Sequence, residues 1–452
     1  MPILLTAALT PMASSCDDDD DSQSRTMVIE KIFLEDVDAS DGVTDREVEY
    51  ARLGSLLRIQ GSGFTGLKYI YVNGYDTYFN NALMTDENVW VTLDDDTPIE
   101  DADPEVRNTI QFVKDNTSTT YSFTIRAASP SVTSIDNTLP SAGETVIVYG
   151  TNLHETTSVT LPSGTVITDG IEYDEEDGTW YSFTMPSGET ASGSITSEGA
   201  NGTAVSPPYF NFNDCYVINF DGLGTLGSWS ATYSEEDLVE DPLSSGRGTC
   251  VMVVPQSKLD EGGVSAGVSS INGFWTAGND DSDDDWNRMT DYIDGDLSVD
   301  SVALQFDVYV PEDWDLTGQV EITIQNNLSN YGYGSACTEY SDSYYNQAYA
   351  WVPWLDRETG DHEAFNTNGR WETITLPLSN FGNYTNDDYD WTFQDVIDDK
   401  NAGSYRNFGI LFCNPDLEYS DDITYPSSTF CQEVYMDNFR IVPCMTITVS
   451  DY

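Results

Sequence analysis

Basic residues are scarce in this sequence, in which 17 Lys and Arg stand against 78 Asp and Glu, for a formal net charge of −61. Proteins that bind nucleic acids use Lys and Arg to displace the counterions of the phosphate backbone. A chain with this charge would repel such a backbone, and it would also repel an anionic membrane surface. The imbalance therefore excludes nucleic acid as a partner and favours a neutral ligand or bound cations.

Histidine is scarcer still, because the chain holds His154 and His362 and no others. A mechanism that needs a His pair or a His-centred triad is therefore poorly supplied. The seven cysteines form no CxxC pair and no Cys/His spacing of a zinc site. Six of them lie in the second half, where they could form up to three disulfides or could be buried and reduced. These six are Cys215, Cys250, Cys337, Cys413, Cys431 and Cys444.

Long helical periodicity is also missing after residue 25. The chain consists of short alternating or apolar runs separated by clusters of Gly, Asn, Asp and Pro, which is typical of all-β proteins. Hydrophobic residues make up 39% and aromatic residues 12% of the 452 positions. This supply of apolar surface and length is enough for about two to four folded domains. We therefore predict an all-β chain of several domains.

The first residues have the composition of a targeting segment. Residues 2–15, PILLTAALTPMASS, are apolar and small, and they are too short to span a bilayer. Cys16 ends a stretch that resembles a bacterial lipobox, in which the cysteine is lipidated, and five aspartates follow at 17–21. Alone, such a run is a solvated linker, but beside a lipobox cysteine it resembles the export tag of Bacteroidetes surface lipoproteins. The resemblance implies that 1–25 anchors an outer-membrane lipoprotein exposed at the cell surface.

An internal repeat occupies the first half of the chain. The segment GSLLRIQGSGF at 54–64 parallels GETVIVYGTNL at 143–153. In each copy, alternating apolar residues between two glycines predict a strand that ends in a glycine turn. The segment SPSVTSIDNTLPSAGETVIVYGTNL at 129–153 is similar to the opening of the immunoglobulin-like IPT/TIG domains. The resemblance implies two such sandwiches in tandem, at 26–128 and 129–208, which serve as spacers.

The second half, 209–452, contains eight of the ten tryptophans. The segment GRWETITLPLSNF at 369–381 resembles the strand W-x-T-x-x-x-P-L-S-x-F of bacterial carbohydrate-binding jelly rolls, in which the tryptophan, here Trp371, packs inside. This resemblance implies a larger jelly-roll-like β-sandwich. Eight tryptophans are more than a core of this size needs, which indicates that some of them face a ligand.

Trp275 and Trp286 are the first candidates for ligand contact. Both fall in INGFWTAGNDDSDDDWN at 271–287, a polar sequence typical of a loop. Neighbouring aspartates do not readily bury a tryptophan, and exposed large aromatics usually bind something. A flat ring can stack on the C–H face of a sugar. The acidic run 279–285 could also hold a structural Ca²⁺, with a solvated loop as the alternative, and we expect no other metal or cofactor.

The stretch QAYAWVPWL at 347–355 is the second candidate. On a strand, Tyr349 and Trp351 share one face about 6.6 Å apart, a spacing that suits neighbouring sugar rings. The rings could form an exposed platform or could be turned into the core with the alanines outside. The polar segments on both sides favour the platform. The residues expected at its edge, or as partners of sugar hydroxyls, are Trp354, Asn326, Asn327 and Arg357.

Together these features resemble the surface glycan-binding proteins of Bacteroidetes polysaccharide-utilisation systems, of the SusE/SusF or SGBP-B type. The resemblance implies non-catalytic capture of a neutral polysaccharide, such as a β-glucan or hemicellulose, beside a SusC/SusD-like importer. A lipid anchor would be the membrane attachment. Two alternatives stay open. The 78 acidic residues could supply the carboxylate pair of a glycoside hydrolase, although no catalytic motif is recognisable, and a surface adhesin could recognise protein instead.

Overall fold

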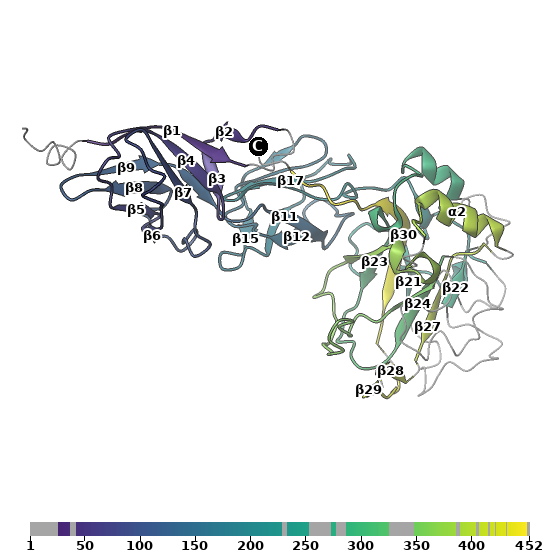
Figure 1. The fold of residues 1–452 in the computed structure, drawn as a ribbon. Helices are drawn as coiled ribbons and strands as arrows, with labels where there is room; N and C mark the ends of the chain where they lie inside the picture. Colours follow the sequence, from purple (N-terminus) through teal and green to yellow (C-terminus); the bar gives the residue numbers. More distant parts are fainter. Residues whose placement is uncertain are drawn as a thin grey trace, which may run out of the picture. The chain divides into compact units, whose positions relative to one another are not determined.

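The computed structural model describes residues 26–36, 42–227, 233–252, 273–276, 286–324, 348–385, 389–403, 406–414, 416–420, 422–430 and 432–449. The described chain is built mainly of strands, as the alternating runs predicted, with one short α-helix, α2 (Phe393–Ala402), in the described ranges. It divides into two compact units, Met1–Ser129 and Pro130–Tyr452 (Figure 1). Within the described residues, no helix is both long and apolar enough to cross a membrane.

The first unit is an immunoglobulin-like sandwich of two antiparallel sheets. Their strand orders are β2-β1-β4-β7 and β6-β5-β8-β9, and a parallel pair, β3 and β10, lies beside them. Side chains alternate between the core and the solvent along these strands, so Leu57 and Ile59 of β4 are buried between more exposed neighbours. The strands are β1 (Val28–Glu35), β2 (Asp45–Glu47), β3 (Tyr50–Arg52), β4 (Leu56–Ser62), β5 (Tyr69–Val72), β6 (Tyr75–Thr77), β7 (Asn88–Thr92), β8 (Thr109–Val113), β9 (Ser118–Ser122) and β10 (Thr124–Arg126).

The second unit begins with another immunoglobulin-like sandwich. Its sheets have the orders β11-β12-β16-β15 and β14-β13-β17-β18, and all the pairings are antiparallel. The strands are β11 (Ser131–Ile135), β12 (Thr145–Thr151), β13 (Ser158–Thr160), β14 (Val166–Ile167), β15 (Glu172–Tyr173), β16 (Trp180–Thr184), β17 (Thr196–Gly199) and β18 (Gly202–Val205).

The repeated glycines of the two sandwiches, Gly61 and Gly150, have the same structural role. A Cβ atom at Gly61 would lie 2.0 Å from the carbonyl oxygen of Val28, and one at Gly150 would lie 1.9 Å from that of Ser131. In both sandwiches the register of the first strand shifts at a β-bulge beside this point, which brings the carbonyl against the glycine. The predicted repeat is confirmed, but these glycines lie within β4 and β12 rather than in a turn.

The rest of the second unit is the larger β-sandwich. One sheet has the order β20-β21-β30-β23-β26, with β19 also paired to β30, and the facing sheet has the order β22-β27-β24-β25. The strands of the first sheet are β19 (Tyr216–Ile218), β20 (Val239–Glu240), β21 (Thr249–Met252), β23 (Val302–Tyr309), β26 (Glu372–Pro377) and β30 (Tyr435–Pro443). The other strands are β22 (Gly273–Trp275), β24 (Gln319–Thr323), β25 (Ala348–Trp351), β27 (Gly409–Cys413) and the hairpin β28 (Leu417–Ser420) and β29 (Ile423–Tyr425). Short 3-10 helices lie at Glu235–Asp237, Trp286–Asp291, Val299–Ser301, Leu378–Asn380 and Gly382–Thr385.

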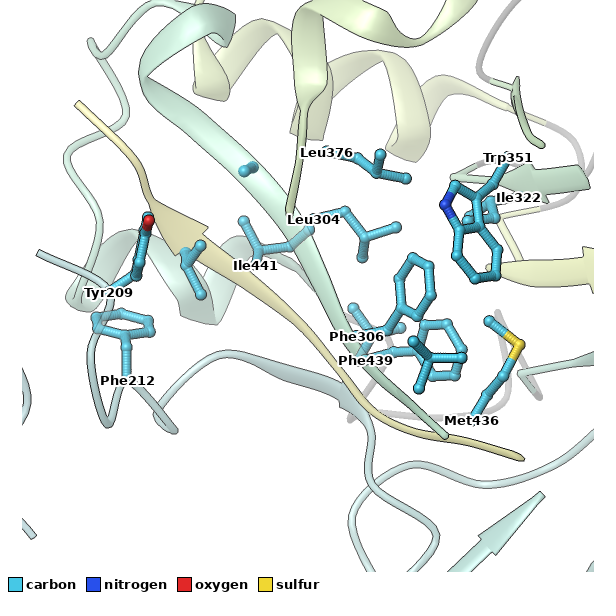
Figure 2. Close-up of a cluster of buried hydrophobic side chains, with 14 of the residues drawn as sticks. Tyr209, Phe212, Leu304, Phe306, Ile322, Trp351, Leu376, Met436, Phe439 and Ile441 are labelled. Atoms are coloured by element: carbon cyan, nitrogen blue, oxygen red, sulfur yellow. The ribbon is translucent and has the colours of Figure 1, made fainter. Parts of the chain in front are cut away.

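Aromatic rings fill the space between the two sheets. The ring centroids of Phe306 on β23 and Phe439 on β30 lie 5.3 Å apart, and Phe306 meets Trp351 of the facing sheet at 5.2 Å. Figure 2 shows Trp351 directed at this cluster, with Ile322 beside it. Such stacked and edge-on aromatic contacts stabilise a core beyond the area that they bury.

The outer face of the β23, β26 and β30 strands is covered by the preceding immunoglobulin-like sandwich. Asp307 accepts hydrogen bonds from Arg247 at 2.6 Å and from Arg440 at 3.3 Å. Arg440 also donates to the Thr138 hydroxyl of that sandwich at 2.7 Å, and the Thr138 amide donates to Thr373 at 3.0 Å. Burial alone would raise the pKa of Asp307, but the charges of Arg440 and Arg247 lower it below its ordinary value. We call Arg247, Asp307 and Arg440 the buried ion network.

Candidate functional site

The outer face of the other sheet, β22-β27-β24-β25, is the candidate site. Residues paired directly across neighbouring strands point to the same side of a sheet. The pairing register places two rows of residues on this side of the sheet. Gln319, two residues before Glu321 on β24, points to the same side. The first row is Trp275, Gly409, Thr323 and Ala348, and the second is Gly273, Leu411, Glu321 and Ala350. We call these nine residues the outer sheet face.

Small residues form the floor of the outer sheet face. A Cβ atom at Gly409 would lie 1.8 Å from the Cε3 atom of Trp275, so the indole ring lies directly over this glycine. Gly273, Ala348 and Ala350 add three more positions with little or no side chain. Of these positions, Gly273, Gly409 and Ala348 are buried and Ala350 is partly exposed, so a ligand could reach the floor at Ala350.

The accessible part of this face lies at the edge strand β25. Leu411 and Ala350 are partly exposed. The Arg357 guanidinium donates to the Ala350 carbonyl oxygen and lies 4.0 Å from the centroid of the Tyr349 ring. Tyr349 is itself partly exposed, and its ring also packs on Phe381 with 5.7 Å between centroids. Tyr349 pairs with the core residue Ile322, so its ring projects to the opposite side of β25 from Ala350. The Arg357 guanidinium lies over that ring at the sheet edge.

Polar side chains are buried on the outer sheet face instead of being solvated. Gln319, Glu321 and Thr323 alternate along β24 with Val320 and Ile322, which point into the core. Burial raises the pKa of Glu321 to about 7. The carboxyl group is therefore neutral in weak acid, where it can donate as well as accept a hydrogen bond.

The predicted platform at 347–355 is turned the other way in the structure. The alternation holds, but the faces are reversed, because Ala350 lies on the outer sheet face and the Trp351 side chain, 6% exposed, lies in the core. The Trp351 ring meets Trp314 edge-on at 5.7 Å between centroids. Alternation fits either orientation, and the aromatic cluster between the sheets fixes the large rings inside. The expectation of an exposed Trp351 is therefore wrong, and Tyr349 stays a candidate at the rim.

The other three candidate tryptophans are also buried. Trp354 donates from its indole nitrogen to the Gly318 carbonyl at 3.0 Å and packs edge-on against Tyr425. Trp286 lies in a 3-10 helix, and the buried Lys400 ammonium of α2 lies 5.0 Å from its ring centroid. Trp275 lies in strand β22 and is 3% exposed. The expectations that Trp275 and Trp286 stand in an open loop and that Trp354 forms an exposed platform edge are therefore wrong, although Trp275 does lie on the candidate face.

Several predictions fall on residues outside the described ranges. These are Asn326 and Asn327, the lipidation site Cys16, and the acidic run 279–285 with its possible calcium. Among the described residues, no group of three or more His, Cys, Asp or Glu side chains could hold a metal ion. Cys215, Cys250 and Cys444 are free thiols, and burial raises the pKa of each to about 12. Trp371 is buried, as its packing motif predicted, and donates to Asp241 at 3.0 Å.

The polar residues of β24 were missed by the sequence reasoning. Their signal is present in GQVEITIQ at 318–325, where Gln319, Glu321 and Thr323 alternate with three aliphatic residues. This is the ordinary pattern of a half-buried strand. Nothing in the pattern indicates that its polar side would be covered, so these residues could not be separated from solvated ones.

Comparison with known proteins agrees with this architecture. A curated IPT/TIG domain-containing protein of Bacteroides ovatus is 28% identical over 319 residues, which cover 69% of this chain and 52% of that protein. The chain thus spans about half the length of this curated relative. The crystal structure of surface glycan-binding protein PbSGBP-B from Prevotella bryantii matches with a TM-score of 0.64 and 17% identity, over 93% of this chain and 100% of that chain.

A second solved structure, SGBP-B from a complex xyloglucan utilization locus in Bacteroides uniformis, matches with a TM-score of 0.45 and 17% identity, over 93% of this chain and 100% of that chain. A family model described as the surface glycan-binding protein B xyloglucan binding domain matches residues 210–443. The match begins with the larger β-sandwich and ends with its last strand, β30. It extends over more than half of the 452 residues. The chain therefore belongs to the surface glycan-binding protein B family, through its xyloglucan binding domain.

Proposed function

We propose that this protein binds a neutral β-glucan of the xyloglucan type, without catalysis, on the outer sheet face. The observation that carries the proposal is the family match over 210–443, which spans the whole larger sandwich. One sheet of that sandwich is covered by the preceding domain through Asp307 and Arg440. The facing sheet carries the small floor and the polar groups, so it is the side on which we place the ligand.

The chemistry of the face suits a sugar chain. The C–H faces of pyranose rings pack on apolar and aromatic surfaces, here the partly exposed Leu411 and Ala350, while hydroxyl groups need hydrogen-bond partners. Arg357, which is partly exposed, provides a donor at the edge of that surface. The net charge of −61 adds a preference for an uncharged polysaccharide over an anionic one.

Binding fits the face better than hydrolysis does. A glycosidase places two carboxyl groups about 5–9.5 Å apart around the bond that it cleaves. Among the nine described residues of the outer sheet face, Glu321 is the one that carries a carboxyl group, so these nine residues do not supply such a pair. Incubation with a panel of polysaccharides should release no new reducing ends, and sustained release would replace binding with hydrolysis.

Placement at the cell surface is part of the same proposal. Proteins of this family in Bacteroidetes act at the cell surface, and the Cys16 stretch followed by acidic residues supports a lipid anchor in this chain. A SusC/SusD-like importer would then receive the captured glycan. Protease treatment of intact cells should digest the protein, and replacement of Cys16 by Ala should release it from the outer membrane.

Affinity gel electrophoresis tests the ligand and the face together. Xyloglucan in the gel should retard the wild-type chain, whereas the anionic polymer polygalacturonate should not. Ala350→Leu places a larger side chain on the accessible floor without touching the core, so we expect it to lose most of the retardation.

Thr184→Leu places a leucine at an exposed strand position of the second sandwich and serves as the control for an added apolar surface side chain. If xyloglucan retards Ala350→Leu and Thr184→Leu equally, the ligand does not bind on the accessible floor of the outer sheet face. If no neutral glycan retards the wild-type chain, the protein-recognising adhesin becomes the better interpretation.

A further inference from the structure

The first sandwich carries a row of tyrosines on the outer face of its β6-β5-β8-β9 sheet. Tyr69 is 48% exposed and Tyr71 of the same strand is partly exposed, and Tyr78, directly after β6, is 79% exposed. The Tyr69 and Tyr71 ring centroids lie 6.1 Å apart, with ring planes within 26° of each other. Along β5 these rings alternate with Ile70 and Val72, which are fully buried. The core of the sandwich is therefore formed without the tyrosines.

Hydrogen-bonding side chains surround these rings. Tyr71 pairs across the sheet with Gln111, which pairs in turn with Thr120, so the three side chains lie in one row on the outer face. The neighbouring row runs from Tyr69 through Val113 to Ser118. The polar side chains around the rings are Asp76, Gln111, Ser118 and Thr120.

The opposite sheet of the same sandwich has a different surface. There, ion pairs occupy the solvent side, with Lys31 bound to Glu47 at 2.6 Å and Arg58 bound to Asp45 at 2.7 Å. Exposed ion pairs are the usual solvent coat of a sheet, whereas a row of large exposed rings marks an interaction site. Phe33 and Trp90 on that sheet are also partly exposed, but charged side chains of the same sheet contact them. The Arg58 guanidinium lies 4.1 Å from the Phe33 ring centroid, and Trp90 donates to Glu35 at 2.8 Å.

We propose that Tyr69, Tyr71 and Tyr78 form a second glycan-binding surface, which we call the tyrosine platform. It takes the same neutral β-glucan as the outer sheet face and therefore rests on the function proposed above. Two nearly parallel rings about one sugar spacing apart offer successive stacking surfaces, and the flanking amide and hydroxyl groups match the edges of the sugar rings. The net charge of −61 opposes an anionic occupant at this site as well.

Full-length variants in xyloglucan affinity gels test the tyrosine platform. The double variant Tyr69→Ala/Tyr71→Ala removes both rings, Tyr69→Phe/Tyr71→Phe keeps them, and Leu56→Ala removes an exposed side chain from the opposite sheet. We expect at least roughly tenfold weaker polysaccharide binding for the Ala pair, because both stacking surfaces of the tyrosine platform are lost. The Phe pair and Leu56→Ala should bind within about twofold of wild type.

Combination with Ala350→Leu separates the two surfaces. Ala350→Leu alone should keep a weak retardation that the added Tyr69→Ala/Tyr71→Ala change abolishes. Wild-type retardation of the Ala pair, together with complete loss in Ala350→Leu, would overturn the tyrosine platform and leave the proposed function intact. No retardation of the wild-type chain by any neutral β-glucan would overturn both. Retardation of the chain by a basic protein instead would assign the tyrosines to protein recognition.

Discussion

The two sheets of the larger sandwich place similar residues on their outer faces and put them in opposite electrostatic states. On β23, Gln305 and Asp307 alternate with core residues, just as Gln319 and Glu321 do on β24. Asp307 is buried beside Arg247 and Arg440, and their charges lower its pKa, whereas burial raises the pKa of Glu321 to about 7. Alternation along the strand therefore determines which side chains point away from the core. Residues distant in the sequence determine whether a carboxyl group on that outer face is ionised.

Removal of the carboxylate from the covered face should have the largest effect. Asp307→Ala leaves the guanidinium groups of Arg247 and Arg440 buried without their counter-ion. Breaking a buried pair in this way costs about 3–5 kcal/mol of unfolding free energy, which urea denaturation would measure. Because the pKa of Asp307 is lowered in the folded state, its contribution is present above its ordinary pKa and is lost as the pH falls below that value.

Asp45→Ala is the matched control, because it removes an aspartate from the exposed pair with Arg58. Exposed pairs contribute at most about 1 kcal/mol. Equal losses in the two variants would mean that the buried ion network is as well solvated as a surface pair.

Replacement of the Glu321 carboxyl group on the outer sheet face should instead increase the free energy of unfolding. The folded pKa of Glu321 lies above its ordinary value of 4.5, at about 7, so ionisation destabilises the fold increasingly between these two values. Glu321→Gln should match wild type near about pH 4 and exceed it by on the order of 3 kcal/mol near about pH 8. Urea denaturation at both values measures the difference. Glu418→Gln, at an exposed position of β28, serves as the control, and a Glu321→Gln variant that is less stable than wild type at high pH would contradict the raised pKa.

Substitution of Trp351, in the core between the two sheets, should have the smallest effect on stability and no effect on glycan binding. Trp351→Phe keeps one aromatic ring against Phe306 and leaves a small cavity, which costs about 1–2 kcal/mol. Because the Trp351 side chain faces the core, xyloglucan should retard this variant as it retards wild type. Selective loss of retardation in a stably folded Trp351→Phe variant would return this residue to the binding surface.

The sequence patterns were sufficient for the architecture. Alternating short runs predicted an all-β chain, and the repeat around Gly61 and Gly150 predicted two related sandwiches, because a close backbone approach leaves glycine as the residue that fits. The packing role of Trp371 also followed from its motif. These features depend on local geometry that each segment carries in its own sequence.

The site could be predicted less well, because its residues depend on distant partners. The polar neighbours of Trp286 suggested exposure, but Lys400 of α2 lies over its ring. Alternation in QAYAWVPWL is equally compatible with both faces, and the choice is made by Phe306 and Trp314 on the facing side of the core. Arg357 and Tyr349 were both proposed, and the structure brings them into contact at the rim.

The buried ion network also determines how far this protein can be shortened. A fragment that starts at residue 209 would contain the whole family match but would lack Thr138, which accepts a hydrogen bond from Arg440. Truncation there would open Asp307 and its two arginines to water and remove the hydrogen bonds that Thr138 makes to Arg440 and Thr373. The smallest autonomous binding fragment should therefore begin at Pro130, with the second sandwich serving as a structural cap rather than a detachable spacer.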